Sequence, residues 1–352
     1  MNRTPLTGKT VKSLKALVSA GFFSLSMLAA PAFAADITLT VHHFLSPKAN
    51  AHVKMIQVWA DRVQQQSRGR IKVEIFPSMA MGGKPPELYK QARDGLADIV
   101  WTLLGSTPGV FPRSEVFELP LVHAGSARAT TIALNKSFDL LADDFNDVHV
   151  IFLHAHDGNL IHSATKPVTS FADVKGMKLR TPSRTGAWLI QAWGAEPVGI
   201  PVPALPQAMA KGVVDGALTT YEIVPTLKLQ ELDKSVTELP NGDRFGTAVF
   251  MFAMNKDRYN SLPTDLKAVI DANSRTNVAD WIGTMWEDFE EDGKQALAKA
   301  KVTTNILDAA EAAKFNAASS TVVDRWIKEA RANGIDGAAL VQKARAAVAA
   351  AN

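Results

Sequence analysis

The chain has 352 residues, which exceeds one ordinary domain and favours two. Its 47% hydrophobic and 21% charged residues exclude disordered and fibrous proteins and predict a full core. Because the chain contains no cysteine, disulfides, Cys-ligated zinc and thiol nucleophiles are excluded.

The first 34 residues have the layout of a secretory signal peptide. Basic side chains precede an apolar stretch at residues 16–30, and a small-x-small site ends at Ala34. The stretch is short for a membrane span, and an N-terminal anchor helix is the alternative. We therefore expect export to the periplasm with cleavage near Ala34. Removing the four basic residues of this segment leaves 34 basic against 35 acidic side chains, so the net charge of +3 does not indicate nucleic-acid binding.

The chain after the signal peptide alternates short β-type runs with helical patterns. Strands are expected at residues 37–41, 71–76 and 97–101, because these runs are rich in β-branched residues, alternate between apolar and polar residues, or do both. Helices are expected between them, at residues 49–67 and 85–94. This β-α-β-α-β order predicts a parallel sheet whose strand carboxyl ends hold the ligand.

A second α/β unit follows. The strands expected here lie at residues 148–153, 178–180, 213–216 and 248–254, and the helices lie at 184–194, 204–211, 263–293, 309–333 and 337–350. A chain that builds one sheet, then another, and then crosses back predicts two lobes with a cleft between them. We expect one lobe from residues 35–157 plus 247–290 and the other from 158–246 plus 291–352.

Several short motifs occur in a consistent order along this chain. They are Pro-x-x-x-x-Gly-Gly at 77–83, Asp-Gly-x-Ala-Asp at 94–98, Asp-Val-Lys-Gly-Met-Lys-Leu-Arg at 173–180, Gly-Ala-Glu-Pro-Val at 194–198, Gly-Val-Val-Asp-Gly at 212–216, and Met-Asn at 254–255 with Leu-Pro at 262–263. In register, these motifs resemble the solute receptors of tripartite ATP-independent periplasmic (TRAP) transporters, the family often labelled by C4-dicarboxylate binding. The resemblance implies an α/β periplasmic-binding-protein fold with two mixed sheets, hinge strands and a long spanning helix.

The resemblance places the ligand anchor at Arg180. In the family the arginine of this strand pairs with the ligand carboxylate, and a guanidinium offers two parallel N–H donors that fit a carboxylate. The alternative is a surface arginine in a salt bridge. The sugar-acid binders of the family carry a second arginine where this chain has Asn159 and Leu160. Because that partner is missing, a doubly charged or polyhydroxylated ligand would leave groups unpaired.

Aromatic and polar residues near the expected strand ends complete the predicted site. The candidate ligand-binding residues are Arg180, His43, Phe44, Trp101, Phe111, His156, Asn159, Trp188, Thr219 and Tyr221. This set resembles the branch of the family that takes aromatic monocarboxylates, although each aromatic residue could instead belong to the core. An aliphatic hydroxy or oxo acid and a dicarboxylate remain alternatives.

Catalytic and cofactor motifs are absent from the sequence. No Gly-x-Ser-x-Gly, His-Glu-x-x-His or phosphate-binding glycine loop is present, so we expect no enzyme activity and no cofactor. The eight histidines are expected to be core or edge residues rather than metal ligands. A bridging calcium held by Glu222 is a less favoured alternative.

The sequence therefore predicts a monomeric periplasmic receptor that closes on a small organic acid anion and delivers it to TRAP permease subunits in the membrane. One alternative is a solute receptor that serves an ATP-driven importer or a tricarboxylate system. Such a protein would still bind a solute, but its membrane partner would differ. A periplasmic organic-acid enzyme and a receptor that feeds a sensor are further alternatives.

Overall fold

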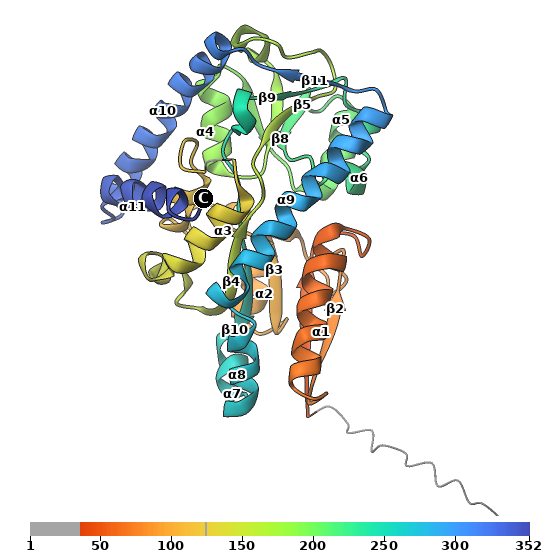
Figure 1. Ribbon diagram of the computed structural model, residues 1–352, viewed down its shortest axis with the longest axis vertical. Coiled ribbons are helices and arrows are strands. Elements are labelled where there is room, and N and C mark those ends of the chain that lie inside the picture. Colours follow the sequence, from red (N-terminus) through yellow and green to blue (C-terminus); the bar gives the residue numbers. More distant parts are fainter. Residues whose placement is uncertain (1–35, 124) are drawn as a thin grey trace, which may run out of the picture. The chain divides into compact units, whose positions relative to one another are not determined.

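The computed structural model describes residues 36–123 and 125–352. The expected signal peptide and its cleavage site lie outside these residues. Within them, no helix is both long and apolar enough to cross a membrane. Two β-sheets with helices packed around them make up the fold (Figure 1), so the predicted α/β class with two mixed sheets is confirmed.

The first sheet has five strands in the order β2-β1-β3-β10-β4. These strands are β1 Ile37–His43, β2 Ile71–Phe76, β3 Ile99–Leu103, β4 Val148–Ala155 and β10 Val249–Asn255. Strand β1 pairs parallel with β2 and β3, which confirms the predicted parallel arrangement, while β10 runs antiparallel between β3 and β4. Every residue of β10 is buried. Its continuous apolar run fits a strand covered on both faces.

The second sheet has six strands in the order β11-β9-β5-β8-β6-β7. These strands are β5 Leu160–Ser163, β6 Lys178–Thr181, β7 Glu196–Gly199, β8 Gly216–Thr219, β9 Ser235–Glu238 and β11 Thr303–Ile306. The sequence analysis missed β5, β7, β9 and β11. Each has only four residues, which is too short for a period of two to stand out.

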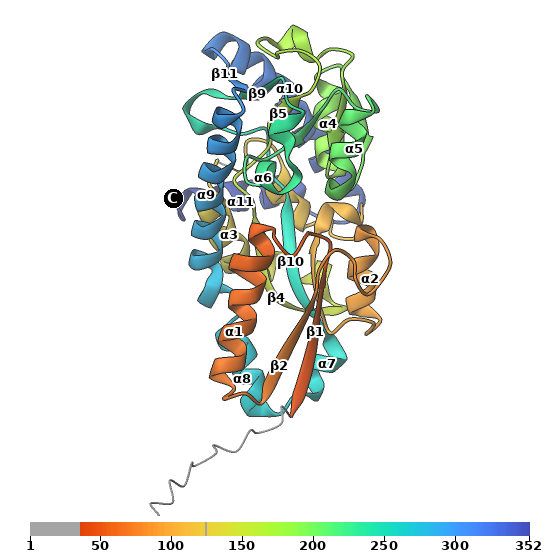
Figure 2. The ribbon, with the colours of Figure 1, turned by 90° about the vertical axis from the view of Figure 1, so that its right-hand side faces the viewer.

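The helices cover both sheets (Figure 2). They are α1 Gln57–Gln66, α2 Leu88–Arg93, α3 Ala127–Lys136, α4 Arg184–Ala192, α5 Leu205–Ala210, α6 Val224–Leu227, α7 Lys256–Ser261, α8 Thr264–Ala272, α9 Thr276–Lys299, α10 Ala309–Ala332 and α11 Gly337–Ala349, and a π-helical turn, η1 Ala51–Ile56, precedes α1. The single helix predicted at 263–293 is wrong, because α8 and α9 are separate. The side chains of Asn273 and Ser274 bond to backbone carbonyls of α8, and Arg275 has a φ of 55°.

Three segments cross between the sheets. One joins β4 to β5, one joins β9 to β10, and the third is helix α9, which packs on α3 and β4 beside the first sheet and on α6 beside the second (Figure 1). A Cβ atom on Gly293 of α9 would lie 1.9 Å from the Tyr221 carbonyl oxygen, so glycine permits the close approach. At the C-terminus, α10 packs on α4 and α11 packs on α3. The lobe boundaries given above stay a prediction.

Candidate functional site

A cavity of about 390 Å³ is lined by residues of both sheets and of the loops that follow their strands. Its volume falls within the range of about 300–1,000 Å³ that is typical of small-molecule sites. Trp101 and Phe250 contribute from the first sheet, and Arg180 and Thr219 contribute from the second. Phe44, directly after β1, also lines the cavity. The wall is largely apolar, so each polar group that faces the cavity can determine how a ligand is oriented.

One charge in this wall is the guanidinium of Arg180 on β6. The residue is only 3% exposed, and its Nε donates to the Ile200 carbonyl at 2.8 Å. Among residues 36–123 and 125–352, no acidic side chain forms an ion pair with it. Burial lowers the pKa of Arg180 to about 9, so the group stays protonated at neutral pH. A buried, unpaired cation is costly, and a bound anion would offset that cost.

His156, just after β4, supplies a neutral donor to the same cavity. Its Nδ1 accepts a hydrogen bond from the Gly158 backbone N–H at 3.1 Å, which places the ring proton on Nε2. Burial lowers the pKa of His156 well below its usual value, so the ring is uncharged at neutral pH. Since Nε2 has no partner in the described part of the chain, its N–H is available to a carboxylate oxygen.

Asn159 lies at a crossing point between the sheets. Its backbone N–H donates to the Gly246 carbonyl at 2.8 Å, and its own carbonyl accepts from the Phe245 N–H at 3.0 Å. These bonds join the β4–β5 segment to the β9–β10 segment. The Asn159 side chain lines the cavity. The two backbone hydrogen bonds fix its position where the two crossing segments meet.

Stacked aromatic rings form one wall of the cavity. The Phe44 ring lies 4.9 Å from that of Trp101 at an interplanar angle of 9°, and Phe250 lies 5.2 Å from Trp101 on a parallel plane at 8°. The indole N–H of Trp101 donates to His154 Nε2 at 2.8 Å, which orients the ring. Trp286 of α9 stacks behind and also lines the cavity. Flat, rigid surfaces of this kind suit a flat apolar ligand.

Glu222, three residues after β8, adds an acid to this apolar wall. It is 7% exposed, and the Thr220 hydroxyl donates to its Oε1 at 3.3 Å. Burial raises the pKa of Glu222 to about 8. Within the described residues, no three His, Cys, Asp or Glu side chains are placed to share a metal ion.

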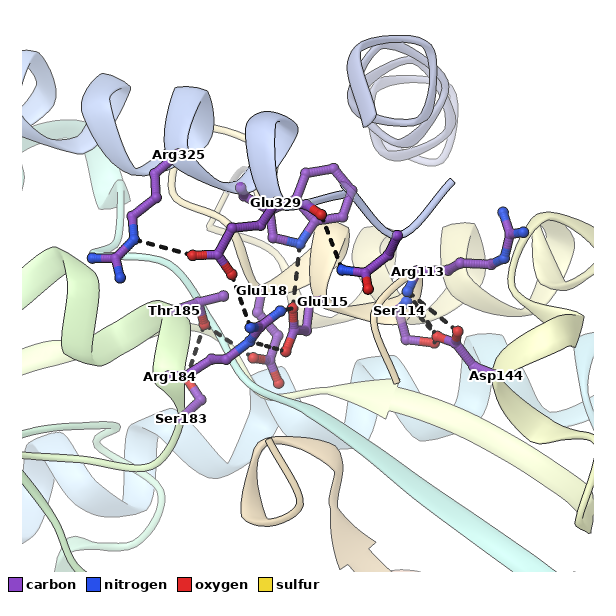
Figure 3. A network of polar contacts seen from close by, with 12 residues as sticks. Arg113, Ser114, Glu115, Glu118, Asp144, Ser183, Arg184, Thr185, Arg325 and Glu329 are labelled. Carbon is purple, nitrogen blue, oxygen red and sulfur yellow. Dashed lines mark hydrogen bonds and ion pairs between the residues drawn. The ribbon is translucent and has the colours of Figure 1, made fainter. Parts of the chain in front are cut away.

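A polar network joins the loop after β3 to α4 and α10 (Figure 3). Two of its residues, Ser183 and Arg184, also line the cavity. Arg184, at the start of α4, makes two bonds of 2.6 Å to the carboxylate of Glu115 and a third of 3.0 Å to Glu329. Beside it, the Thr185 hydroxyl donates to Glu118 at 3.1 Å. Glu115 and Glu118 belong to η4 Ser114–Glu118, which follows β3. The network therefore ties the first sheet's loop to α4 and α10.

A family model matches most of this architecture. The model for bacterial extracellular solute-binding proteins of family 7 (DctP) matches residues 41–329. The chain belongs to this family. Its members are extracytoplasmic receptors that bind small organic acids and work with membrane permease components. The resemblance to TRAP receptors noted in the sequence is thereby confirmed.

Solved structures of other TRAP receptors resemble this one closely. A marine metagenome receptor described as specific for aromatic acid ligands, solved with 3-hydroxybenzoate, is 40% identical, covers 91% of this chain and 100% of its own, and has a TM-score of 0.88. A receptor from Rhodoferax ferrireducens solved with copurified benzoate is 39% identical, covers 89% and 98%, and has a TM-score of 0.86. The C4-dicarboxylate-binding periplasmic protein of Rhodobacter capsulatus is 25% identical over 296 residues, 84% of this chain and 87% of its own.

Six of the ten predicted ligand-binding residues line the receptor's cavity: Arg180, Phe44, Trp101, His156, Asn159 and Thr219. The other four lie elsewhere. His43 Nε2 bonds to His52 Nδ1 at 2.8 Å, and Phe111 packs against Tyr89 and Phe145.

Trp188 and Tyr221, the other two predicted residues outside the cavity, pack against other parts of the fold. Trp188 lies under the guanidinium groups of Arg184 and Arg325, 4.9 and 4.3 Å from its ring. Tyr221 is buried against Gly293. Each of the four was selected for its position near a strand end, but the direction of its side chain depends on neighbours that are distant in sequence.

Sequence reasoning missed Phe250 and Trp286 as cavity residues. Phe250 stands in a strand that is buried on both faces, so no periodicity marks the side that meets the cavity. Trp286 stands on the apolar face of α9, where core packing is the usual role of a large side chain. The signal available in the sequence was that β10 and α9 both belong to the part of the chain that returns from one lobe to the other, next to the expected cleft.

Proposed function

We propose that this TRAP receptor binds an aromatic monocarboxylate of the benzoate type. The observation that carries the proposal is Arg180, a buried guanidinium without an acidic partner in the described chain, in a cavity walled by aromatic rings. Arg184 also lines the cavity but is paired with Glu115 and Glu329, so one unpaired cation matches a single carboxylate. A second carboxylate, or several hydroxyls, would lie against Phe44, Trp101 and Phe250 without enough polar partners.

In the proposed complex, Arg180 takes the carboxylate and the Nε2–H of His156 donates to it, with Asn159 and Thr219 beside them. The ring of the ligand lies along the wall of Phe44 and Trp101. Hydrogen bonds to charged groups contribute about 1.5–3 kcal/mol each, and the rings add apolar burial. The receptors solved with benzoate and 3-hydroxybenzoate, at 39% and 40% identity, support this choice of ligand.

Hinge closure is the proposed route to capture. A ligand that contacts Arg180 on one side and Phe44 on the other stabilises the state in which the two walls are close together. We assign residues 35–157 plus 247–290 to one lobe and 158–246 plus 291–352 to the other. The closed receptor then delivers the acid to the membrane permease.

The proposal also covers the processing, location and oligomeric state of the receptor. We propose that the chain is cleaved near Ala34 and acts in the periplasm as a monomer, without enzyme activity, without a cofactor and without binding nucleic acid. A receptor for an aliphatic hydroxy or oxo acid or for a dicarboxylate is the alternative within the class, and an organic-acid enzyme is the alternative outside it.

Isothermal titration of the receptor purified from the periplasm tests the proposal. The panel is benzoate, 3-hydroxybenzoate, lactate, pyruvate, succinate and galacturonate. We expect heat of binding from the aromatic acids and recovery of the ligand unchanged after incubation. Tight binding of succinate or galacturonate alone would contradict the aromatic assignment, and conversion of the bound acid to a product would indicate an enzyme.

A further inference from the structure

Glu222 is the polar group of the cavity that the proposed mode of carboxylate binding leaves unused. Its side chain is more than nine-tenths buried and lines the cavity. One oxygen accepts from Thr220 at 3.3 Å, and the other has no hydrogen-bond partner among the described residues. That oxygen is not among the fully buried unpaired atoms of the described residues, so it is reachable from the cavity, where a polar group of a ligand can hydrogen-bond to it.

The electrostatic surroundings of Glu222 specify what that group can be. Two arginines line the same cavity, Arg180 and Arg184, and in the described chain neither forms an ion pair with Glu222. Burial raises its pKa to about 8, with only the Thr220 hydrogen bond acting against this shift. At neutral pH the carboxyl group is therefore mostly protonated. It can donate through its O–H and accept through its carbonyl, as a neutral hydroxyl requires.

Two unlike kinds of polar group thus line the cavity. Arg180 and His156 offer only donors, which suits a carboxylate, whereas Glu222 offers a donor and an acceptor. Aromatic side chains, among them Trp101 and Phe250, fill the wall around them. We propose that Glu222 is a specificity-determining residue that selects aromatic acids carrying a ring hydroxyl away from the carboxylate, at the 3- or 4-position. This inference rests on the proposed function of the receptor.

A hydroxyl next to the carboxylate would not serve this role. In 2-hydroxybenzoate the two groups are adjacent and bond to each other, so a carboxylate held by Arg180 would keep the hydroxyl beside Arg180. Benzoate would leave the Glu222 carboxyl unpaired. A site that is built to hydrogen-bond a hydroxyl discriminates against the analogue that lacks it, because the buried partner then stays unsatisfied.

Calorimetric titration with benzoate and with 2-, 3- and 4-hydroxybenzoate tests the inference. In the wild-type receptor we expect the 3- or the 4-isomer to bind about tenfold more tightly than benzoate. In Glu222→Leu the preference should disappear while benzoate binds at least as well, because no polar group is left unpaired. Glu222→Gln should keep part of the preference, since an amide also donates and accepts.

Glu118→Gln is the matched control. Glu118 is an equally buried acid whose pKa is also raised to about 8 by burial, but it does not line the cavity, so its substitution should leave the preference unchanged. Equal binding of benzoate and all hydroxybenzoates by the wild type would overturn the inference and leave the proposed function intact. An equal loss of affinity for all four ligands in Glu222→Leu would assign Glu222 a structural role, and this result would also overturn the inference. Failure of the wild type to bind any aromatic acid would instead contradict the proposed function.

Discussion

Two arginines of this receptor are almost equally buried, yet their surroundings differ. Arg180 is 3% exposed and Arg244 is 8% exposed. Arg244, between β9 and β10, lies 3.4 Å from Glu290, 3.5 Å from Asp157 and 3.7 Å from Glu238. Arg180 has backbone carbonyls as partners and forms no ion pair with the described residues. The counter-charge, rather than the burial, separates Arg244 from the arginine that we propose binds the ligand.

The position of each arginine fits this difference. Asp157 lies in the β4–β5 segment, Arg244 in the β9–β10 segment and Glu290 on α9, so the Arg244 cluster joins all three segments that cross between the sheets. Burial raises the pKa of both Asp157 and Glu290, which shows how strongly water is excluded there. Arg180 lies instead at the end of a strand, facing a cavity. The Arg244 charge is paired with acidic side chains of the fold, whereas the Arg180 charge, in the proposed complex, is paired with the ligand carboxylate.

The largest expected effect is on the Arg244 cluster. Arg244→Met leaves three acidic side chains without their cation, and breaking a buried ion pair costs about 3–5 kcal/mol. We expect a loss of this size in the free energy of unfolding, measured by urea denaturation. Arg70→Met is the control, because Arg70 and its partners are exposed and such pairs contribute about 0–1 kcal/mol. Equal losses in the two variants would show that the buried cluster has no special role.

Arg180→Met should weaken ligand binding without lowering the stability of the receptor, which is the opposite of the effect expected for Arg244→Met. The loss of a charge-assisted hydrogen bond is expected to weaken aromatic-acid binding by about 1.5–3 kcal/mol, roughly 10- to 150-fold, in calorimetric titrations. The ligand-free variant should be at least as stable as the wild type, since an uncompensated buried charge is removed. If Arg180→Met loses as much stability as Arg244→Met, or binds at full affinity, the contrast between the two arginines is wrong.

Glu118 extends the comparison to a buried acid without a cation. Burial raises its pKa from 4.5 to about 8, so the folded state holds the proton more tightly than the unfolded state does. Its contribution to stability is therefore complete below about pH 4.5 and is lost as pH rises toward 8. Between pH 5.5 and 7.5, the wild type should lose up to about 2.7 kcal/mol relative to Glu118→Gln.

Urea denaturation of both proteins at the two pH values measures this difference. Buried histidines with lowered pKa values, such as His123 and His154, act in the opposite direction, because the unfolded state takes up their protons below pH 6.5. They are present in both proteins and cancel in the difference. A difference that does not change with pH would mean that Glu118 is ionised in the folded receptor.

Arg184 is an intermediate case and carries the smallest expected effect. It lines the cavity like Arg180, but it already pairs with Glu115 and Glu329, and its side chain is 26% exposed (Figure 3). Arg184→Gln should cost about 1 kcal/mol of stability and change aromatic-acid affinity by less than about threefold. A loss of binding like that of Arg180→Met would identify Arg184 as the anion site instead.

Local patterns in the sequence were enough to predict part of this receptor. Longer strands such as β1 and β2 and the capped helices have periodicity and end signals within their own residues. The motif that contains Arg180 places this residue on a strand, and a guanidinium fits a carboxylate in any fold. The α/β class followed from such local information, whereas the family and six of the residues that line the cavity came from the resemblance of the short motifs to TRAP receptors together with the expected strand ends.

Only the tertiary structure decided which side chains meet in the cavity. Phe250 faces it and Phe111 does not, although both are buried apolar residues near strand ends. From the sequence, Glu222 is only a less favoured calcium ligand, and its burial beside Thr220 becomes visible in the structure. The direction and protonation of a side chain depend on neighbours from other segments, and the sequence lists those segments without placing them side by side.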